Sequence, residues 1–492
     1  MTANSSTITM SAAEPNSVSF SEADLAVFSA ASGDRNPLHL SESYARCTAY
    51  GQRVVFGCLG AIACLSHIRL PRNWALTRLQ AKFFRPMFLG VNYRFETSAE
   101  DRKWVVRMFD GSRPVVALTV NAAPSISDEV SETPSTAYFE RSQAVLRSDG
   151  EIAPGLEISG RYACDPPALA ALAECWSGAA PYAVALLAWS SYLVGMELPG
   201  ESALFTKFAL DLDGVTRRLA ELEYRARVRS VDQQLQSVQM DVSLSVAGRT
   251  IASGQYSAFS RTTFPLVEDV DSSAVRRDSL AGRVAVIIGA SRGLGAAIKR
   301  TLELRGAIVY TLSRSAGEPG ADRIQVGDAA DPEVLKRLRE RVLAEQGRLD
   351  ILVCNACPPI VPLRLEPNAL DRIGAYIQQA VWITLAPLCM FLDLLNQSDG
   401  TAVIISSAAI ESPVREWPHY LAAKQAVEML ARVASFEYPR IGTLIVRPPK
   451  MLTTLTNTPM GRIDASSPAL FANRIAARLE QAIEPRKTEV LS

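Results

Sequence analysis

The chain has 492 residues, 48% of them hydrophobic and 21% charged, which is typical of folded soluble protein and enough for about three domains of roughly 150 residues each. Lys and Arg together number 51, and so do Asp and Glu. Because no net charge favours nucleic acid or an anionic membrane, neither is expected as a partner, and partners must be inferred from individual sites.

The N-terminal stretch MTANSSTITMSAAEPNS is polar and lacks the basic and apolar regions of a signal peptide. No uninterrupted apolar run approaches the ~20 residues that a membrane helix needs. Eight cysteines in this length form no disulfide framework, so the sequence predicts a protein of the reducing cytoplasm. The CNAC stretch at 354–357 has no second cysteine pair, and no metal site is predicted.

The first informative stretch is SGDRNPLHLSESYA, at 32–45. Asn-Pro is a turn signal, and Pro37 suits the first turn of a short helix that Asn36 caps. Asp34 would then lie on the loop before this helix, and His39 would lie within its first turns. A carboxylate and an imidazole held at one rigid corner can act as a general acid and base. A capped surface turn is the alternative interpretation.

Two polar stretches, one from Ala123 on and one ending at Ser279, divide the chain. The first two segments contain similar stretches: LPRNWALTRLQAKF begins at Leu70, and LPGESALFTKFALD begins at Leu198. Each follows a long apolar run and precedes alternating sequence. An apolar helix is a buried helix, and antiparallel strands of period two supply a sheet to wrap it. This pattern predicts a long helix wrapped by a curved sheet, and it predicts that this unit occurs twice in the chain. The alternative is that the two helices are similar by chance.

Three motifs of the first segment carry a family resemblance: FSAASGDRNPLHLSESYA, VVFGCLG and FFRPMFLG. With them, residues 17–125 resemble a MaoC-like (hydratase 2) hot-dog domain, from the family of enoyl-thioester hydratases and dehydratases. Residues 157–262 resemble a degenerate hot-dog partner, which has no histidine and no counterpart of Asp34 and His39. The resemblance implies that this second half completes the tunnel and the acyl pocket.

The resemblance also implies removal of water from a 3-hydroxyacyl thioester, which needs a base for the C2 proton and an acid for the hydroxyl. We assign His39 as the base and Asp34 as the acid, and the reverse assignment is open. Asn36 and the backbone N–H near Gly57, at the start of the buried helix, would form the oxyanion hole or the pocket. Family members usually have a histidine before that glycine, whereas here Phe56 stands there.

The third segment opens with LAGRVAVIIGASRGLGAAIKRTLELRGAIVYTLSRS, from Leu280 on. An apolar strand runs into three glycines, and a helical pattern follows. This arrangement is typical of dinucleotide binding, because the backbone must approach a pyrophosphate at a helix N-terminus. The next strand ends in Arg314 and not in an acid, and Arg292 adds a second cation, which predicts NADP(H). Alternatively, both arginines are merely solvated.

Further along the chain, Ser407 stands thirteen residues before Tyr420, and Lys424 follows four residues after it. Residues four apart share a helix face, so the tyrosine and the lysine can meet at one substrate. A free tyrosine has a pKa of ~10, and a neighbouring ammonium would lower that pKa. Tyr420 would give a proton to a carbonyl oxygen that Ser407 holds, while the nicotinamide gives a hydride to the carbon.

Residues 280–492 resemble the short-chain dehydrogenase/reductase family throughout. The cofactor-binding residues that motif and resemblance imply are Gly289, Ser291, Arg292, Gly293, Leu294, Gly295, Arg314, Asp328, Asn355, Tyr420, Lys424 and Thr453. The chain departs from the family at Cys354 and Cys357, in LVCNACP where the family has N-N-A-G, and at Pro449 in place of a glycine. The asparagine often found on the helix before the serine strand is not evident, so no residue is assigned to that position of the proton relay.

The predicted fold class is an α+β double hot-dog followed by an α/β Rossmann doubly wound parallel sheet. Its expected parts are a disordered N-terminus (1–16), the catalytic hot-dog (17–125), a linker (126–156), the degenerate hot-dog (157–262), a second linker (263–279) and the NADP-binding domain (280–492).

A ketoreductase makes the 3-hydroxyacyl thioester that a hydratase-type domain consumes. We therefore expect a bifunctional 3-oxoacyl-thioester reductase and 3-hydroxyacyl-thioester dehydratase of fatty-acid or polyketide biosynthesis, a homodimer that uses NADPH and acts on acyl carrier protein or CoA thioesters. One alternative runs both reactions backwards, as an enoyl-CoA hydratase and 3-hydroxyacyl-CoA dehydrogenase of β-oxidation. Another treats the hot-dog pair as a non-catalytic module that docks an acyl carrier.

Overall fold

The computed structural model describes residues 16–71, 74–124, 137–148, 150–176, 181–213, 221–261, 277–314, 323–457, 461, 463–481 and 483–492. The chain forms two compact units, one of Met1–Cys47 with Gln52–Thr263 and one of Thr48–Gly51 with Phe264–Ser492. The predicted disordered N-terminus (1–16) lies outside the described residues except for Asn16, and so does the second predicted linker up to residue 276.

The first unit is built on an antiparallel sheet, in which the described residues form eleven strands in the order β1-β3-β4-β5-β2-β8-β11-β10-β9-β7-β6. Their bounds are β1 (Ser17–Ser19), β2 (Trp74–Phe83), β3 (Asn92–Glu100), β4 (Lys103–Asp110), β5 (Arg113–Pro124), β6 (Tyr138–Phe139), β7 (Glu157–Ala163), β8 (Ala203–Leu212), β9 (Leu222–Asp232), β10 (Ser237–Val246) and β11 (Arg249–Ser260). The runs β3-β4-β5-β2 and β9-β10-β11-β8 meet where β2 pairs with β8. The two LP stretches of the sequence thus lead into neighbouring strands.

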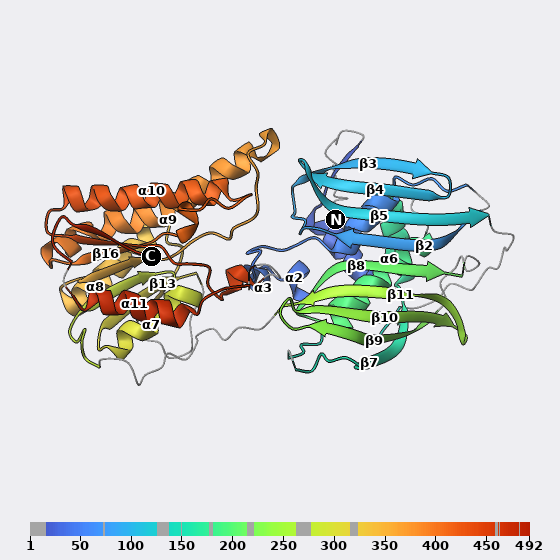
Figure 1. The fold of residues 1–492 in the computed structure, drawn as a ribbon, viewed down its shortest axis with the longest axis horizontal. Helices are drawn as coiled ribbons and strands as arrows, with labels where there is room; N and C mark the ends of the chain where they lie inside the picture. Colours follow the sequence, from blue (N-terminus) through green and yellow to red (C-terminus); the bar gives the residue numbers. More distant parts are fainter. Residues whose placement is uncertain are drawn as a thin grey trace, which may run out of the picture. The chain divides into compact units, whose positions relative to one another are not determined.

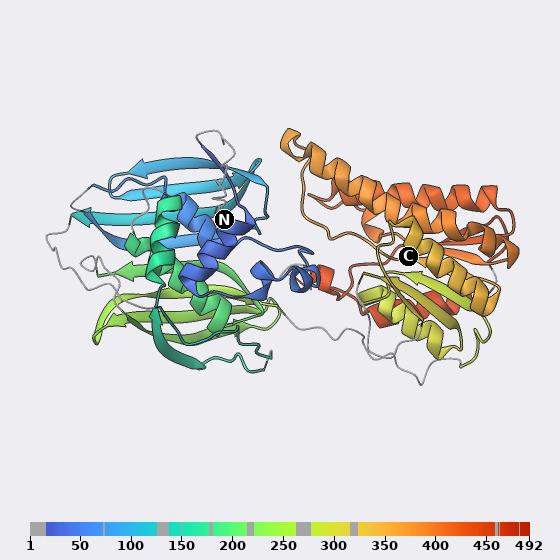
Figure 2. The same cartoon turned by 180° about the vertical axis from the view of Figure 1, so that it is seen from behind.

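Helices cover one face of this sheet, as the view from behind shows (Figure 2). They are α1 (Glu22–Ser32), α2 (Pro37–Leu40), α3 (Glu42–Arg46), α4 (Gly57–Leu65), α5 (Pro166–Cys175), α6 (Pro181–Tyr192) and the π-helical turn η1 (Leu193–Glu197). The two apolar helices of the prediction are α4 and α6, and they pack against each other. Every residue of α4 after Gly57, and of α6 after Pro181, is buried, as expected for helices that are apolar on all sides.

The predicted linker 126–156 belongs to the fold at the residues described within it. Strand β6 pairs with β7, and the ring of Phe139 packs 5.7 Å from Tyr162 and 5.9 Å from Tyr192. The prediction of a linker is wrong for this part, because two aromatic residues in a polar stretch bury enough apolar surface to hold the chain against the sheet.

The second unit is built on a parallel sheet, in which the described residues form seven strands in the order β14-β13-β12-β15-β16-β17-β18. They are β12 (Val284–Ile288), β13 (Ile308–Ser313), β14 (Ile324–Val326), β15 (Ile351–Cys354), β16 (Thr401–Ile405), β17 (Gly442–Val446) and β18 (Thr488–Leu491). The central strands are buried along their whole length and mostly apolar, as expected for a sheet covered on both faces.

Helices lie on both faces of this second sheet (Figure 1). The helices α7 (Gly293–Leu304) and α11 (Pro468–Leu479) share one core, and α8 (Pro332–Gln346), α9 (Leu370–Gln397) and α10 (Pro418–Glu437) share the other. Short 3-10 turns η3 (Pro367–Ala369), η4 (Ala408–Ile410) and η5 (Thr454–Thr456) join them. The predicted Rossmann-type sheet is confirmed. The strand order reverses between β12 and β15, so their carboxyl ends form the expected ligand edge.

Among the described residues, one helical segment, Pro367–Gln397, is long and apolar enough to cross a membrane by length and composition. It contains α9, which packs on α8, α10 and the sheet. One face of α9 therefore belongs to the core of the second unit.

Candidate active sites in the two units

The first candidate site begins where α1 ends. Gly33 caps this helix in the left-handed conformation (φ 70°), and a Cβ there would lie 2.5 Å from the Phe139 ring. The chain therefore turns sharply, which only glycine allows at such close approach. The next residue, Asp34, points into the unit and is 1% exposed.

The carboxylate of Asp34 is held by groups from both halves of the first unit. Its Oδ2 accepts a hydrogen bond from the Ser191 hydroxyl of α6 (2.7 Å), and its Oδ1 accepts one from the backbone N–H of Asn36 (3.0 Å). Burial raises the pKa of Asp34 from 3.8 to about 6, and the two hydrogen bonds offset part of that rise. The result is a carboxyl group that can hold or release a proton close to neutral pH.

Asn36 caps the short helix α2, as predicted, by accepting the N–H of Leu38. Its amide nitrogen lies 3.0–3.2 Å from three backbone carbonyl oxygens of the second half, those of Gly195, Gly200 and Glu201. Because the amide donates to these carbonyls, Asn36 fastens the loop to the second half of the unit and has little donor capacity left for an oxyanion.

His39 lies in α2, where it was expected, with its ring over Phe56 at a centroid distance of 4.0 Å. Its Nδ1 bonds to the carbonyl oxygen of Val54 at 2.6 Å, which requires the proton on Nδ1 and leaves Nε2 as the basic nitrogen. Burial is the main cause that lowers the pKa of His39 to about 4; the Val54 bond opposes this shift, and the nearby Arg261 cation contributes to it. The imidazole is therefore neutral at ordinary pH.

Phe56 directly precedes α4 and is fully buried, at the position where a histidine is usual in the family that this segment resembles. Gly57 begins the helix, and a Cβ on it would lie 3.1 Å from the Phe83 ring. The first N–H groups of a helix have no partner within the helix and carry its positive dipole end. This arrangement fits the predicted donor role of the Gly57 region.

Three residues of this corner carry no sequence signal of their own: Ser191, Gly195 and Arg261. A Cβ on Gly195 would lie 2.7 Å from both carboxylate oxygens of Asp34, so this position must stay a glycine. Arg261 is buried and donates to the carbonyls of Glu201 (2.8 Å) and Ser202 (3.1 Å). The similarity between the two LP stretches could have indicated that the helix before the stretch at Leu198 faces the site of Asp34 and His39.

The second candidate site begins at the end of β12, where Gly289 adopts φ 88° and its N–H bonds to Leu312. A Cβ on Gly295 would collide with the carbonyl oxygen of Gly289 and lie 2.5 Å from the amide nitrogen of Asn355. That amide donates to the Gly289 carbonyl at 2.7 Å and fixes the turn. Only hydrogen fits at these glycines, so the backbone can approach a pyrophosphate at the N-terminus of α7.

The other predicted cofactor residues surround this turn. Gly293 has φ 55°, and a Cβ there would lie 3.2 Å from the Thr453 methyl group, so the segment before η5 reaches the glycine turn. Arg314 follows β13 and is exposed, and Asp328 follows β14. Exposed Ser291 and half-buried Arg292 lie in the turn itself, and Leu294 is buried in α7. These residues fit a nicotinamide dinucleotide bound at the N-terminus of α7.

The structure brings Ser407, Tyr420 and Lys424 together, each of them 8–9% exposed. Ser407 begins η4 at the end of β16, and Tyr420 and Lys424 share one face of α10. The Lys424 ammonium donates to the carbonyl of Ile405 at 2.7 Å and lies 5.7 Å from the centre of the Tyr420 ring. The three groups can thus act on one carbonyl oxygen.

The expected lowering of the tyrosine pKa is wrong for this structure. Burial, followed by the nearby Cys357, raises the pKa of Tyr420, while Ser407 as a hydrogen-bond partner works against the rise. Desolvation of the phenolate outweighs the ammonium, whose own hydrogen bond is directed to Ile405. Tyr420 is therefore protonated at neutral pH and equipped to act as an acid.

Two departures from the resemblance also lie at this site. The Cys357 thiol lies 3.6 Å from the hydroxyl of Tyr376 on α9, whereas Cys354 is buried at the end of β15. Gln378 and Gln379, where an asparagine is usual, are exposed on α9. Within the described residues no group of three His, Cys, Asp or Glu could hold a metal ion.

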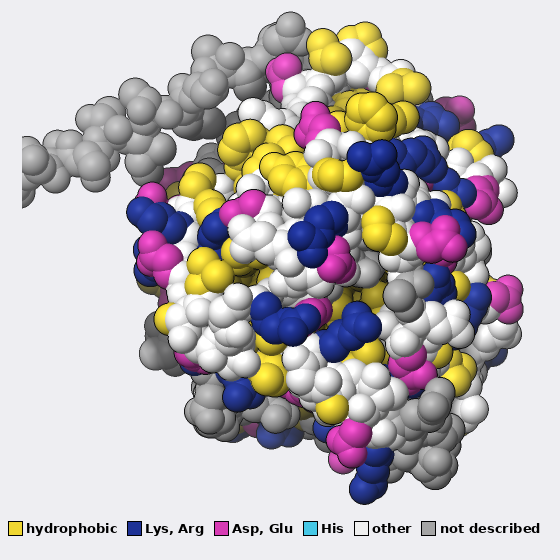
Figure 3. Space-filling view, turned by 90° about the vertical axis from the view of Figure 1, so that its left-hand side faces the viewer, with side chains coloured by type: hydrophobic (Ala, Val, Ile, Leu, Met, Phe, Trp, Pro, Cys, Tyr) yellow, Lys and Arg dark blue, Asp and Glu magenta, His cyan; other side chains and the backbone are white. Residues whose placement is uncertain are grey.

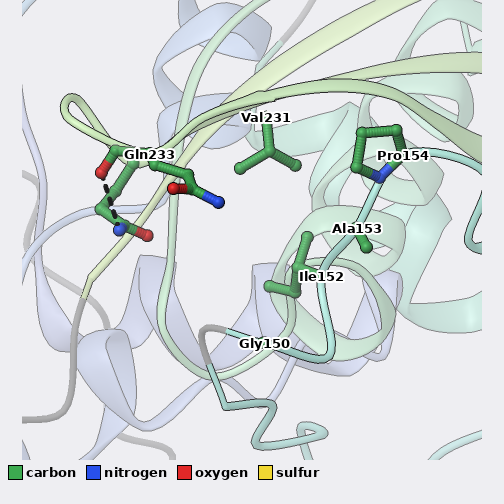
Figure 4. A pocket seen from close by; sticks show the side chains of 7 residues that line it. Gly150, Ile152, Ala153, Pro154, Val231 and Gln233 are labelled. Carbon is green, nitrogen blue, oxygen red and sulfur yellow. Dashed lines mark hydrogen bonds between the residues drawn. The ribbon is translucent and has the colours of Figure 1, made fainter.

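A pocket of the first unit lies between the loop before β7 and the β9–β10 hairpin (Figure 4). It is lined by Gly150, Ile152, Ala153, Pro154, Val231, Gln233 and Gln236. The Gln236 amide donates to the Gln233 backbone at 3.0 Å. The lining offers no ionisable group, so the pocket lacks the means for acid–base chemistry.

Comparison with protein families gives one match for each unit. Residues 3–121 match the MaoC like domain, and residues 283–464 match the short chain dehydrogenase family.

Relatives of this chain include proteins named as an oxidoreductase, a reductase and a dehydrogenase. An uncharacterised oxidoreductase of Mycobacterium tuberculosis is 30% identical over 35% of this chain and 70% of its own length. The D-erythrulose reductase of Gallus gallus is 29% identical over 40% of this chain and 82% of its own length. The cis-4-hydroxycyclohexanecarboxylate dehydrogenase of Sinomonas cyclohexanicum is 32% identical over 34% of this chain and 71% of its own length.

Two solved structures were also compared. The KRED1-Pglu enzyme is 24% identical over 42% of this chain and all of its own, with a TM-score of 0.39. An alcohol dehydrogenase from Thermococcus sibiricus, complexed with 5-hydroxy-NADP, is 24% identical over 42% of this chain and 95% of its own, with a TM-score of 0.37.

The Asp34→Asn substitution should stabilise the first unit at high pH. The folded state holds the Asp34 proton more tightly than the unfolded chain, so stability is lost as the pH rises from about 4 through about 6, by about 3 kcal/mol in total. The variant should melt at a higher temperature than wild type near pH 8 and at a similar temperature near pH 4. Asp241→Asn, an exposed carboxylate of β10, is the control. An equal gain at both pH values would contradict the shifted pKa.

The Arg314→Gln substitution should weaken binding of NADPH by about 10- to 100-fold and leave NADH binding unchanged, because a hydrogen bond to a charged phosphate contributes about 1.5–3 kcal/mol. Titration of cofactor fluorescence measures both dissociation constants. Arg337→Gln, on the exposed side of α8, removes the same charge elsewhere and should change neither. An unchanged NADPH affinity in the Arg314 variant would mean that this arginine is only solvated.

Proposed function

Because the chain belongs to the short-chain dehydrogenase family through residues 283–464 and carries a MaoC-like domain at residues 3–121, we propose that it is a bifunctional enzyme. Its second unit would reduce 3-oxoacyl thioesters with NADPH, and its first unit would remove water from the 3-hydroxyacyl products. The observation that carries the proposal is the presence on one chain of a buried Asp-His corner and a Ser-Tyr-Lys corner beside a glycine turn.

In the first unit, the pKa values of Asp34 and His39 indicate which residue acts as the acid and which as the base. At a pH where the pair holds one proton, that proton resides on Asp34, with a pKa of about 6, and not on His39, with a pKa of about 4. Moving it to His39 would cost about 3 kcal/mol. We therefore keep His39 Nε2 as the base for the C2 proton and Asp34 as the acid for the leaving hydroxyl.

We further propose that the first unit is a double hot-dog with one working half. The second half lacks histidine, yet it supplies Ser191 to Asp34 and three carbonyls to Asn36. Its role would be to position the acid and to complete the acyl pocket. The Gly57 N–H at the start of α4 would stabilise the enolate oxygen.

In the second unit, NADPH supplies a hydride when it is bound. Protonated Tyr420 would give its proton to the carbonyl oxygen that receives a hydrogen bond from Ser407, and the Lys424 ammonium would stabilise the phenolate left behind. Its relatives' names, D-erythrulose reductase among them, support an oxidoreductase. A raised pKa keeps the proton on Tyr420, as the acid of a carbonyl reduction requires.

The two activities share the 3-hydroxyacyl thioester, which gives a chemical reason for their fusion in one chain. NADPH preference favours biosynthesis, so we place the enzyme in fatty-acid or polyketide assembly on acyl carrier protein or CoA thioesters. The β-oxidation direction would require NAD, against which Arg292 and Arg314 argue.

A docking role for the first unit is the second candidate function, and Phe56 favours it. Its ring occupies the place of the usual histidine and lies flat enough (30°) on His39 to cover one side of the imidazole. In that case the hot-dog pair would hold an acyl carrier and present it to the reductase.

We also propose a homodimer of the cytoplasm. The helix α10 exposes Met429, Val433 and Phe436 along one stripe, Phe436 at 84%, and such an apolar face favours a second copy as its cover.

All eight cysteines are free thiols, which suits a reducing compartment. The face drawn in Figure 3 mixes both signs of charge among apolar side chains, and this mixture supports the expectation that nucleic acid is not a partner.

The test is intact-mass analysis of a 3-oxoacyl thioester, on CoA and on a carrier protein, incubated with the protein and NADPH. A gain of about 2 mass units followed by a loss of about 18 is expected, because addition of H2 precedes removal of water. Tyr420→Phe should slow the first step by about 100-fold or more, and His39→Ala should stop the reaction after it. A gain of two that goes no further in wild type, across several acyl chains, would support the docking module. No gain at all would refute the reductase.

Dehydration should show a bell-shaped dependence on pH. Its kcat/KM should be highest between about pH 4 and 6, where Asp34 is protonated and His39 neutral, and should fall tenfold per pH unit above about 6. The measurement follows enoyl-thioester absorbance from a 3-hydroxyacyl substrate. Asp34→Asn should lack the limb near pH 6 in its residual activity. A wild-type rate that is flat from pH 5 to 8 would rule out proton donation by Asp34.

A further inference from the structure

Glu428 is a buried carboxylate that the proposed chemistry does not use. It lies on α10, four residues after Lys424 and eight after Tyr420, on the same helix face. Its side chain is fully buried. A buried charge is costly unless it is paired and hydrogen-bonded, so the partners of Glu428 indicate what the residue is for.

Two partners from different strands meet at this carboxylate. The hydroxyl of Ser406 donates to Oε1 at 2.6 Å. The Arg447 guanidinium donates through Nε to Oε1 (2.9 Å) and through a terminal nitrogen to Oε2 (2.7 Å), which is the strong bidentate geometry. Arg432 adds a longer contact of 3.5 Å from the exposed side. Burial opposes ionisation, but Arg447 and Ser406 hold the pKa of Glu428 below its ordinary value.

Each partner leads directly to the reductase site. Ser406 is the residue before Ser407, and the carbonyl before it, that of Ile405, receives the Lys424 ammonium. Arg447 follows β17 and begins the segment that runs to Thr453 beside the glycine turn. Backbone hydrogen bonds join the two strand ends as well, from Ser406 N–H to Val446 (2.7 Å) and from Ala408 N–H to Pro448 (3.0 Å).

We propose that Glu428 is a positioning residue for carbonyl reduction. This inference rests on the proposed reductase activity. Glu428 ties the end of β16 and the end of β17 to the helix that carries Tyr420 and Lys424, and so fixes the distance from Ser407 and the cofactor-side segment to the tyrosine. A misplacement of about 1 Å at such a site can cost about 100-fold in rate, because the reacting groups must be aligned before reaction.

The test compares Glu428→Gln with Glu411→Gln. Glu411 pairs with the same guanidinium at 2.7 Å but is half-exposed, so it matches the chemistry without reaching Ser406. Glu428→Gln should lower kcat for 3-oxoacyl reduction by about 10- to 100-fold, with less than about a threefold change in NADPH affinity, since the glycine turn and Arg314 are untouched. Rates are taken per NADPH-binding site, so loss of folded protein does not count. Glu411→Gln should behave as wild type.

Ser406→Ala is the second variant, because it leaves the Glu428–Arg447 pair intact and removes only the link to the serine strand. It should lower kcat by about fivefold or more, with a melting temperature close to that of wild type. Normal kcat in both Ser406→Ala and Glu428→Gln would overturn the inference. So would a loss explained wholly by weaker NADPH binding.

Amide hydrogen exchange separates failure of the inference from failure of the proposed function. Exchange at residues 404–410 and 446–453 should speed up in Glu428→Gln and not in Glu411→Gln, with no substrate needed. If wild type reduces no 3-oxoacyl thioester, the function fails, and the same variants are compared on D-erythrulose, the substrate named for a relative. Unchanged amide exchange in Glu428→Gln would refute the proposal that Glu428 holds the ends of β16 and β17 against α10, whatever the substrate is.

Discussion

The hydrogen bond between Ser191 and Asp34 is the interaction on which the first unit depends. It joins residues 157 positions apart and reaches a carboxylate that is almost completely withdrawn from water. Withdrawal raises the proton affinity of the acid, and the bond keeps that rise from becoming so large that the group could never ionise. The second half of the first unit has no histidine, yet it has a physical role at this site. Its helix α6 provides Ser191 as the hydrogen-bond donor to Asp34, and Gly195 leaves room for the carboxylate.

In the second unit, too, an ionisable group is buried and held by hydrogen-bond partners, but these partners come from other elements. Tyr420, the acid that we propose there, is also buried, and burial again dominates its pKa. Here the parallel sheet brings several strand ends to one edge, so short contacts such as that of Lys424 with Ile405 can hold the site. In both units, buried ionisable groups are kept in place by partners from other strands or helices, and each corner is only as well formed as the packing between those elements.

The sequence predicts the local parts of this structure well and the distant ones poorly. The Asn36 cap, the start of α4 at Gly57 and the glycine turn after β12 all follow from residues close together in the chain, whose conformations are set by turn and cap chemistry. The partnership of Ser191 with Asp34, or of Glu428 with Arg447, depends on tertiary packing and leaves no local pattern. The aromatic pair of β6 was hidden for the same reason, because a polar stretch gives no periodicity to detect.

The two corners also differ in how they respond to pH, and this difference bears on how they would work together. Tyr420 stays protonated above neutrality, so the proposed reduction would retain its acid over the whole physiological range. Asp34, with a pKa of about 6, loses its proton within that range. If both reactions occur, dehydration and not reduction is the step that slows as the pH rises, and the 3-hydroxyacyl thioester accumulates first. The balance between hydroxyacyl and enoyl products would then be set in the first unit, by the burial of one carboxyl group and its bond to Ser191.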